Sequence, residues 1–175
     1  GKELLFKDLT TQWSSQGLHL IKGGTGSGKS VLVKMLLGIH QDYDGQILID
    51  VQDIQQSDVK SLRKQVTIIS ENYPLLGKTV FEAISYSRKA SKRKGAELML
   101  NKVQQDLPEK AKLKLDDQIG SQGKSLSKGQ ERILLFTRAL LTRKPILLLD
   151  EPFHGIEPHI QQHLLKLIKK LKRIR

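Results

Sequence analysis

A glycine-rich segment in the first third of the chain has the residue types and spacing that phosphate binding requires. The segment "KGGTGSGKSVLVKMLL" follows the apolar run HLIK and opens a helical pattern. It fills the template G-x-x-x-x-G-K-[S/T] in the strand, loop and helix context that the template needs. The residues that we expect to contact a nucleotide here are Gly23, Gly24, Thr25, Gly26, Ser27, Gly28, Lys29, Ser30 and Val31.

Each residue type in this loop has a physical reason. Glycines allow the backbone to curl so that successive N–H groups point into one concavity. A helix that begins near Lys29 adds roughly half a positive charge at its N-terminus, which favours an anion. Lys29 would reach the β- and γ-phosphates, and the Ser30 hydroxyl would ligate Mg²⁺. The alternative is a glycine-rich turn that only caps a helix, and the loop alone does not separate kinases, GTPases, motor ATPases and transporters.

A pair of carboxylates follows a second apolar run. In "KPILLLDEP", Asp150 and Glu151 stand at the end of a strand-like segment, the edge where α/β sheets present ligands. Asp150 would hold Mg²⁺ opposite Ser30, and Glu151 could orient or deprotonate an attacking water. Such a pair favours hydrolysis by water over transfer to a substrate hydroxyl. The alternative is a strand that ends in two solvated acids before a proline turn.

The segment "SLSKGQ" places small and polar residues in the first turn of another helical pattern. Gly129 stands in that first turn, although glycine costs about 1 kcal/mol relative to alanine inside a helix. An ordinary serine-capped helix is one explanation for this start. A helix that only had to pack would not need a glycine at that position.

These motifs together resemble those of ABC ATPases. LSKGQ (126–130) resembles the LSGGQ signature of that family, and it stands between the phosphate-binding loop and the Asp-Glu pair as the family requires. Residues 44–71 resemble the strand, short helix and Q-loop approach of exporter-type nucleotide-binding domains, and "DDQIGSQGKSLSKGQ" resembles their segment before the signature. The resemblance covers nearly the whole chain. Lys128 and Glu71 depart from it, because they replace a signature glycine and the usual Q-loop glutamine.

The resemblance implies roles for particular residues. Two such domains pair head to tail around ATP, so Ser127 would offer a hydroxyl and Gly129 a backbone N–H to the γ-phosphate held by the partner domain, with Gln130 as a further contact. A bulky side chain at position 129 would then block that approach. Lys29 and Glu151 are the expected catalytic residues. The expected Mg²⁺ ligands are Ser30, Glu71 and Asp150.

Strand-like and helical runs alternate along the chain, which indicates an α/β fold. We expect strands at 19–22, 46–50, 66–70 and 146–150, and helices at 29–37, 59–64, 80–85, 96–105, 128–141 and 158–172. The resemblance implies a P-loop NTPase core with a mainly parallel sheet flanked by helices. It also implies one ABC ATPase domain over 1–175, with core segments 1–79 and 124–175, an inserted helical subdomain at about 80–123, and the signature helix starting near 127.

Composition limits the classes of partner. The 175 residues suffice for one domain, the absence of cysteine excludes a thiolate metal site, and the formal net charge of +12 suggests an anionic partner. Aromatic residues make up only 5% of the chain, too few for a base-stacking platform, so the composition does not favour nucleic acid as a partner. Phe6 and Trp13 are expected in the core, and His154, His159 and His163 are assigned no catalytic role.

Three functions compete. The first is the ATP-hydrolysing domain of an ABC transporter, bound to ATP and Mg²⁺, paired with a second ABC ATPase domain and driving a fused or separate transmembrane domain from the cytoplasmic side of the membrane. The second is a soluble ABC-type ATPase that acts on nucleic acid, as in repair or translation. The third is a small-molecule kinase, which leaves LSKGQ and the Asp-Glu pair unexplained. The resemblance also implies a fragment trimmed at both ends, because the family's adenine-stacking aromatic and switch histidine would lie before residue 1 and after residue 175.

Overall fold

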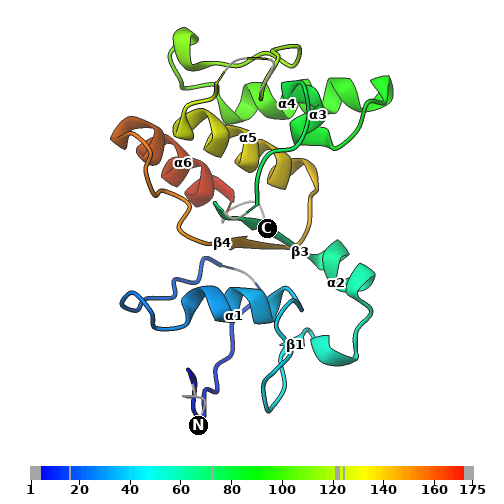
Figure 1. Ribbon diagram of the computed structural model, residues 1–175, viewed down its shortest axis with the longest axis vertical. Coiled ribbons are helices and arrows are strands. Elements are labelled where there is room, and N and C mark those ends of the chain that lie inside the picture. Colours follow the sequence, from blue (N-terminus) through cyan, green and yellow to red (C-terminus); the bar gives the residue numbers. More distant parts are fainter. Residues whose placement is uncertain (1–4, 16, 72, 121–122, 124, 172–175) are drawn as a thin grey trace.

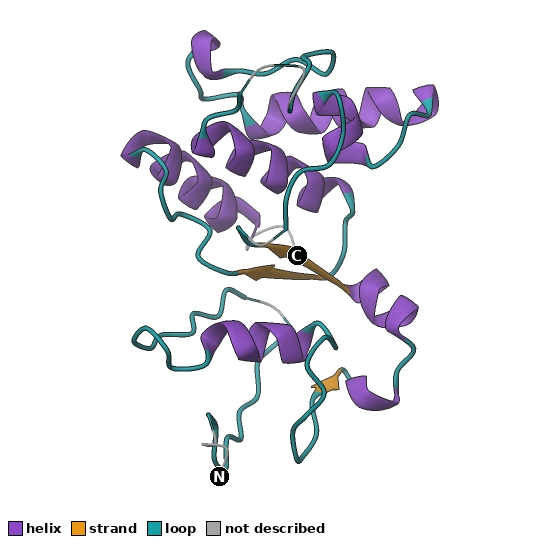
Figure 2. Ribbon diagram, viewed as in Figure 1, coloured by secondary structure: helices purple, strands orange, loops and turns teal. Residues whose placement is uncertain are grey.

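The computed structural model describes residues 5–15, 17–71, 73–120, 123 and 125–171. Helices account for most of the regular structure (Figure 2). In chain order the elements are α1 (Lys29–Leu36), β1 (Leu48–Ile49), β2 (Gln52–Asp53), η1 (Ile54–Gln56), α2 (Val59–Gln65), β3 (Val66–Ile69), α3 (Val80–Ser85), η2 (Ala90–Lys92), α4 (Arg93–Val103), η3 (Glu109–Ala111), α5 (Lys128–Leu141), β4 (Ile146–Leu149) and α6 (Pro158–Leu171).

The elements form layers around the pair β3–β4, so the fold is α/β as expected. Helices α5 and α6 cover one face of this pair, and α1 lies on the other side (Figure 1). Helices α3 and α4 pack on α5 at the end of the molecule farthest from α1. Every described element between residues 80 and 123 is an α-helix or a 3₁₀-helix.

Strands β3 and β4 are parallel and in register from Val66 opposite Ile146 to Ile69 opposite Leu149. Their side chains alternate between two hydrophobic clusters, as the two-residue period of a strand requires. Leu147 and Leu149 pack against the cluster under α5 and α6, whereas Ile146 and Leu148 pack against the cluster around Ile54, Leu62 and Val66. This burial on both faces explains the nearly continuous apolar sequence of β4.

The sheet is smaller than the sequence indicates. The stretch 46–50 forms no parallel strand, because Leu48–Ile49 folds back on Gln52–Asp53 as an antiparallel hairpin. Asp50 adopts a left-handed backbone with φ 55° to make that reversal possible. In the described part of the chain, the parallel pairing is therefore confined to β3 and β4.

The expectation of a strand at 19–22 is wrong. This stretch has no regular secondary structure and pairs with none of the described strands. Leu20 and Ile21 are 76% and 41% exposed. An apolar run becomes a strand only when a neighbour accepts its hydrogen bonds, and that requirement is not visible in local sequence.

Helix α5 is the central element of the larger core. Residues 132–140 are all buried, because α3, α4, α6 and β3 surround them. Phe136 and Leu134 are fully buried there. Phe6 and Trp13 do not belong to this core: Phe6 is half-buried, and Trp13 is 40% exposed and stacks on His19 at 6.2 Å between ring centroids. The expectation that these two aromatics are core residues is therefore wrong.

Candidate nucleotide-binding site

The glycine-rich loop leads directly into α1, as the sequence predicts. Gly26 and Gly28 adopt left-handed φ angles of 80° and 86°, which glycine tolerates without strain. Gly28 is the N-cap of α1, and among the described residues no side chain accepts a hydrogen bond from the helix start. An added Cβ at Gly23 would lie 2.4 Å from Ser27 Oγ, so the loop closes on itself there. Within the part of the chain that the structure describes, the backbone N–H groups at the start of α1 are therefore free to bind an anion.

The Lys29 side chain lies across this loop. Its Nζ donates hydrogen bonds to the carbonyl oxygens of Gly23 at 2.8 Å and Gly24 at 2.6 Å, and it lies 3.4 Å from Ser27 Oγ. All three acceptors are neutral, so they orient the ammonium group without cancelling its charge. The loop therefore presents a fixed positive charge beside the helix N-terminus. Thr25 and Val31, also expected nucleotide contacts, lie in the turn of the loop and in the first turn of α1.

The structure brings Ser30 and Asp150 together. Ser30 Oγ lies 3.5 Å from Asp150 Oδ1, and Ser70 Oγ lies 3.5 Å from Asp150 Oδ2. The backbone N–H of Asp150 donates to the carbonyl of Ile69 at 2.9 Å, which fixes Asp150 directly after β4. A hydroxyl and a carboxylate oxygen are hard ligands of the kind that Mg²⁺ prefers. The pair therefore fits the expected metal-binding role.

Within the described residues, no group of three or more His, Cys, Asp or Glu side chains converges on a point that could hold a metal ion. The third expected ligand, Glu71, is engaged elsewhere. Its Oε1 accepts a hydrogen bond from Arg132 at 2.9 Å and lies 3.2 Å from His154 Nδ1. Its role as a Mg²⁺ ligand stays a prediction.

The electrostatic surroundings of Glu71 favour its ionised form. The hydrogen bond with His154 lowers the pKa of Glu71 most, the positive charges of Arg132, His154 and Lys128 lower it further, and partial desolvation opposes them. The Glu71 side chain is 41% exposed, whereas the Arg132 side chain is only 5% exposed. A charged guanidinium is therefore buried against a carboxylate that faces solvent.

Glu151 follows Asp150 in a strained conformation. It adopts φ 46° and is exposed, and its carbonyl accepts a hydrogen bond from the backbone N–H of His154 at 3.2 Å. A non-glycine residue in the left-handed region carries strain of about 1–3 kcal/mol, and such residues gather at functional sites. This geometry is compatible with the general-base role expected for Glu151.

The start of α5 is a capping box. Ser127 Oγ accepts a hydrogen bond from the Gln130 N–H at 3.2 Å, and Gln130 Oε1 accepts one from the Ser127 N–H at 3.1 Å. Ser127 uses its oxygen as an acceptor, so its hydroxyl hydrogen stays available to donate. Among the described residues, no hydrogen bond or ion pair links Ser127, Gly129 or Gln130 to the loop around Lys29.

Packing within the chain explains why residue 129 is a glycine. It is buried, and an added Cβ would lie 2.8 Å from Glu157 Oε2 and 3.3 Å from Ile160 Cγ1. A side chain at position 129 would therefore point toward the start of α6. That such a side chain would also block an approaching nucleotide stays a prediction, and the Gly129 N–H lies in the first turn of α5.

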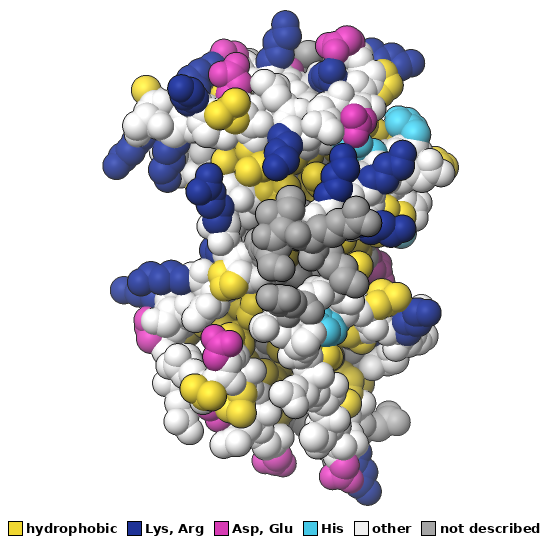
Figure 3. Space-filling view, turned by 180° about the vertical axis from the view of Figure 1, so that it is seen from behind, with side chains coloured by type: hydrophobic (Ala, Val, Ile, Leu, Met, Phe, Trp, Pro, Cys, Tyr) yellow, Lys and Arg dark blue, Asp and Glu magenta, His cyan; other side chains and the backbone are white. Residues whose placement is uncertain are grey.

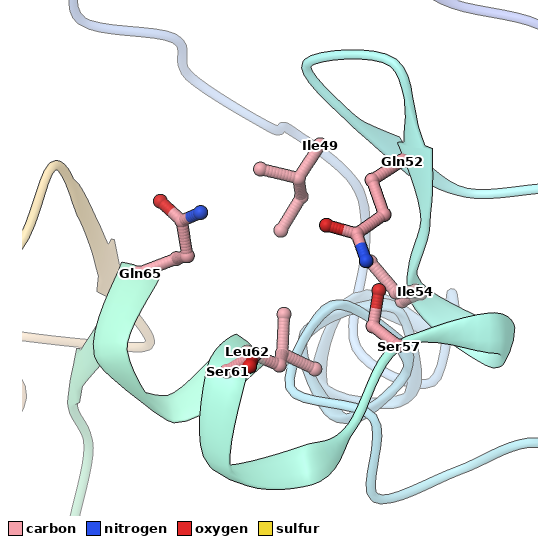
Figure 4. A pocket seen from close by; sticks show the side chains of 7 residues that line it. All are labelled: Ile49, Gln52, Ile54, Ser57, Ser61, Leu62 and Gln65. Carbon is pink, nitrogen blue, oxygen red and sulfur yellow. The ribbon is translucent and has the colours of Figure 1, made fainter.

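One cavity lies away from these residues. Its volume is about 20 Å³, and Ile49, Gln52, Ile54, Ser57, Ser61, Leu62 and Gln65 line it (Figure 4). Such a volume suits about one water molecule that hydrogen-bonds to the serine and glutamine side chains. It is not a nucleotide site.

Comparison with known proteins decides the family. The family model described as "ABC transporter" matches residues 6–154 of the chain. The chain belongs to the ABC transporter family. Its fold is that of a P-loop NTPase.

Several ABC relatives are known. The chain is 35% identical to the mitochondrial iron-sulfur clusters transporter ATM1 of Debaryomyces hansenii, over 86% of this chain and 22% of the relative. It is 36% identical to the ATP-dependent lipid A-core flippase of Sodalis glossinidius, over 87% of this chain and 27% of the relative. A solved bacterial Atm1-family ABC exporter with ATP bound is similar with a TM-score of 0.68 and 26% identity, over 85% of this chain and 26% of that one. The chain thus spans about a quarter of the length of these relatives.

Three residues near the proposed site are absent from the set of site residues that the sequence predicts. Arg132 and His154 hold Glu71, and Lys128 lies over Gly155, where an added Cβ would be 3.1 Å from Lys128 Nζ. His154 was assigned no role, and Arg132 stands in an ordinary helical pattern. Arg132 and Glu71 are 61 positions apart, so no local signal connects them.

Proposed function

We propose that this chain binds and hydrolyses ATP to drive an ABC exporter. The observation that carries the proposal is the pairing of Ser30 with Asp150 at 3.5 Å, because it joins the phosphate-binding loop to the end of β4. The Asp-Glu pair thereby lies beside the start of α1, where the phosphates of ATP would bind.

Each site residue has a separate role in this proposal. The N–H groups of the loop and the Lys29 ammonium bind and orient the phosphates, and Ser30 and Asp150 hold Mg²⁺ with Glu71 as a third ligand. When bound, Mg²⁺ supplies positive charge that stabilises the phosphate oxygens. Glu151 orients the attacking water and accepts its proton. Lys29 and Glu151 are the catalytic residues of this proposal.

The signature residues act on the nucleotide of a second ABC domain. In a head-to-tail pair, Ser127 donates its hydroxyl hydrogen to the γ-phosphate and the Gly129 N–H does the same from the first turn of α5. The position of Gly129 in the first turn and the helix dipole both support this arrangement. Gln130 contributes mainly by holding Ser127 in the capping box.

The names of the relatives support a membrane partner and a location at the membrane. Two of the relatives are named as a transporter and a flippase, and the similar solved chain is an exporter. We infer that this domain works with a transmembrane domain, fused or separate, on the cytoplasmic side of the membrane. Among the described residues, no helix is both long enough and apolar enough to cross a bilayer. We also propose a core of 1–79 and 124–175 with a helical subdomain at about 80–123.

The nucleic-acid alternative has less support. On the face that Figure 3 shows, Lys and Arg side chains are spread over the helical part of the molecule, with a few Asp and Glu side chains among them. The relatives carry the names of transport proteins. The positive net charge is thus better explained by a solvated surface and a phosphate site.

The test is nucleotide binding and phosphate release by the purified protein. Lys29→Ala is expected to abolish ATP binding, because it removes the charge that lies across the loop. Lys34→Ala is the matched control, since Lys34 stands in the last turn of the same helix. If Lys29→Ala binds ATP as well as the wild type does, the site is not the one proposed.

A further inference from the structure

A charged cluster connects three segments that lie around the proposed nucleotide site. Glu71 follows β3, Arg132 lies in α5 five residues after Ser127, and His154 follows the Asp-Glu pair. Arg132 and His154 both contact the same oxygen of Glu71, at 2.9 Å and 3.2 Å. One carboxylate therefore ties the signature helix to the loops after β3 and β4.

The two partners of this ion pair differ in their access to solvent. The Arg132 side chain is 5% exposed, and Glu71 is the carboxylate to which it donates. A buried guanidinium without a counter-charge is strongly unfavourable, so Arg132 resists the departure of Glu71. Glu71 is 41% exposed and could leave toward solvent at a lower cost.

We propose that Arg132, assisted by His154, is a positioning residue that latches Glu71 to α5 and thereby competes with Mg²⁺ for this carboxylate. This inference rests on the proposed function, in which Glu71 ligates the metal. A carboxylate whose Oε1 already accepts from two donors binds a cation less well than a free one. The latch thus lowers the contribution of Mg²⁺ to nucleotide binding. The size of that contribution then depends on the position of α5, the signature helix.

The experiment measures the dissociation constant of a fluorescent ATP analogue with Mg²⁺ and again with EDTA. Arg132→Gln removes the buried charge and leaves Glu71 held by His154 alone. We expect the analogue to bind about fivefold tighter in Mg²⁺ and unchanged in EDTA. A merely structural role for Arg132 would change both constants alike. The matched control is Arg88→Gln, which breaks the ion pair of Arg88 with Glu82 on the helical part of the chain and is expected to change neither constant.

A second substitution tests the identity of the competing carboxylate. In a Glu71→Gln background, Arg132→Gln is expected to have no further effect on the Mg²⁺-dependent constant, because the latched group is already gone. If the fivefold gain persists in that background, Glu71 is not the group that Arg132 controls and the latch is wrong.

Two other results are decisive. If Arg132→Gln does not fold, His154→Gln carries the test, because it weakens the second contact on the same oxygen and is expected to tighten Mg²⁺-dependent binding by a smaller factor. An unchanged or weaker Mg²⁺-dependent constant in the folded variants overturns the latch. If the wild type binds the analogue in neither solution, the proposed function fails instead.

Discussion

The hydroxyl of Ser30 lies 3.5 Å from Oδ1 of Asp150, although the two residues stand 120 positions apart in the chain. One belongs to the first turn of α1 and the other follows β4 directly. Their meeting requires that α1 and the end of β4 be held together, and it is the point at which the fold assembles its proposed metal ligands.

Asp150→Asn is expected to weaken Mg²⁺-dependent nucleotide binding at least about tenfold, because an amide oxygen lacks the charge that the metal prefers. Binding in EDTA should be unchanged, since Asp150 contacts no phosphate in this scheme. Titration of a fluorescent nucleotide in both solutions checks this result. Asp44→Asn, an exposed carboxylate away from β4, is the control. Equal affinities of wild type and Asp150→Asn in Mg²⁺ would count against the site.

Glu151→Gln is expected to lower the rate of phosphate release by roughly 10²–10⁴-fold and to leave ATP affinity unchanged, which is the usual effect of losing a general base. The amide keeps the size of the side chain but cannot accept the proton of water. Single-turnover hydrolysis and equilibrium binding measure the two quantities separately. Glu97→Gln, an exposed change on α4, is the control. Hydrolysis at the wild-type rate would remove Glu151 from the mechanism.

Helices with local signals were predicted well. Residues 80–85 and 128–141 match α3 and α5, because Thr79 and Ser127 are side-chain caps that mark each start. The bounds of α1 and α2 were right to within one residue. α4 instead begins at Arg93, three residues before its predicted start, and no side chain among the described residues caps it. A helix cap and the apolar periodicity of a helix both involve residues that are close together in the chain. Both signals can therefore be recognised in a single sequence.

Features that depend on distant partners were predicted less well. The apolar run 19–22 lacks a neighbouring strand, and the 46–50 run pairs with the residues just after it instead of with a parallel strand. In the site, the P-loop and the Asp-Glu pair were visible as motifs. The partners of Glu71 were not visible in the sequence, because the contact with Arg132 depends on how α5 packs beside β3.

Ser127 has two separable roles, and three substitutions distinguish them. Ser127→Ala is expected to lower the free energy of unfolding by about 1 kcal/mol, because the N-cap of α5 is lost. Asparagine and aspartate both cap helices about as well as serine, so neither should lower it much. Ser127→Asp should nevertheless abolish ATP-driven pairing through repulsion of the γ-phosphate, whereas Ser127→Asn should retain part of it. Urea unfolding measures the stability. Sedimentation in the presence of ATP measures the pairing, with Glu151→Gln added to each variant to prevent hydrolysis. Equal pairing of the Asp and Asn variants would contradict a phosphate contact at Ser127.

Gln104 is a buried polar residue in the helical part of the chain. Its side-chain amide donates to the Leu113 carbonyl at 2.8 Å and accepts from the Leu113 N–H at 3.0 Å, and the residue is 3% exposed. Gln104→Leu leaves both backbone groups of Leu113 buried without a partner, so the free energy of unfolding should fall by about 2–4 kcal/mol. Gln105→Leu is the matched control, because the adjacent glutamine is exposed and its loss should change stability by less than about 0.5 kcal/mol. Urea titration measures both free energies of unfolding, with the dependence on urea concentration held equal for the two variants. A similar midpoint for the two variants would mean that the Gln104 contacts contribute little to stability.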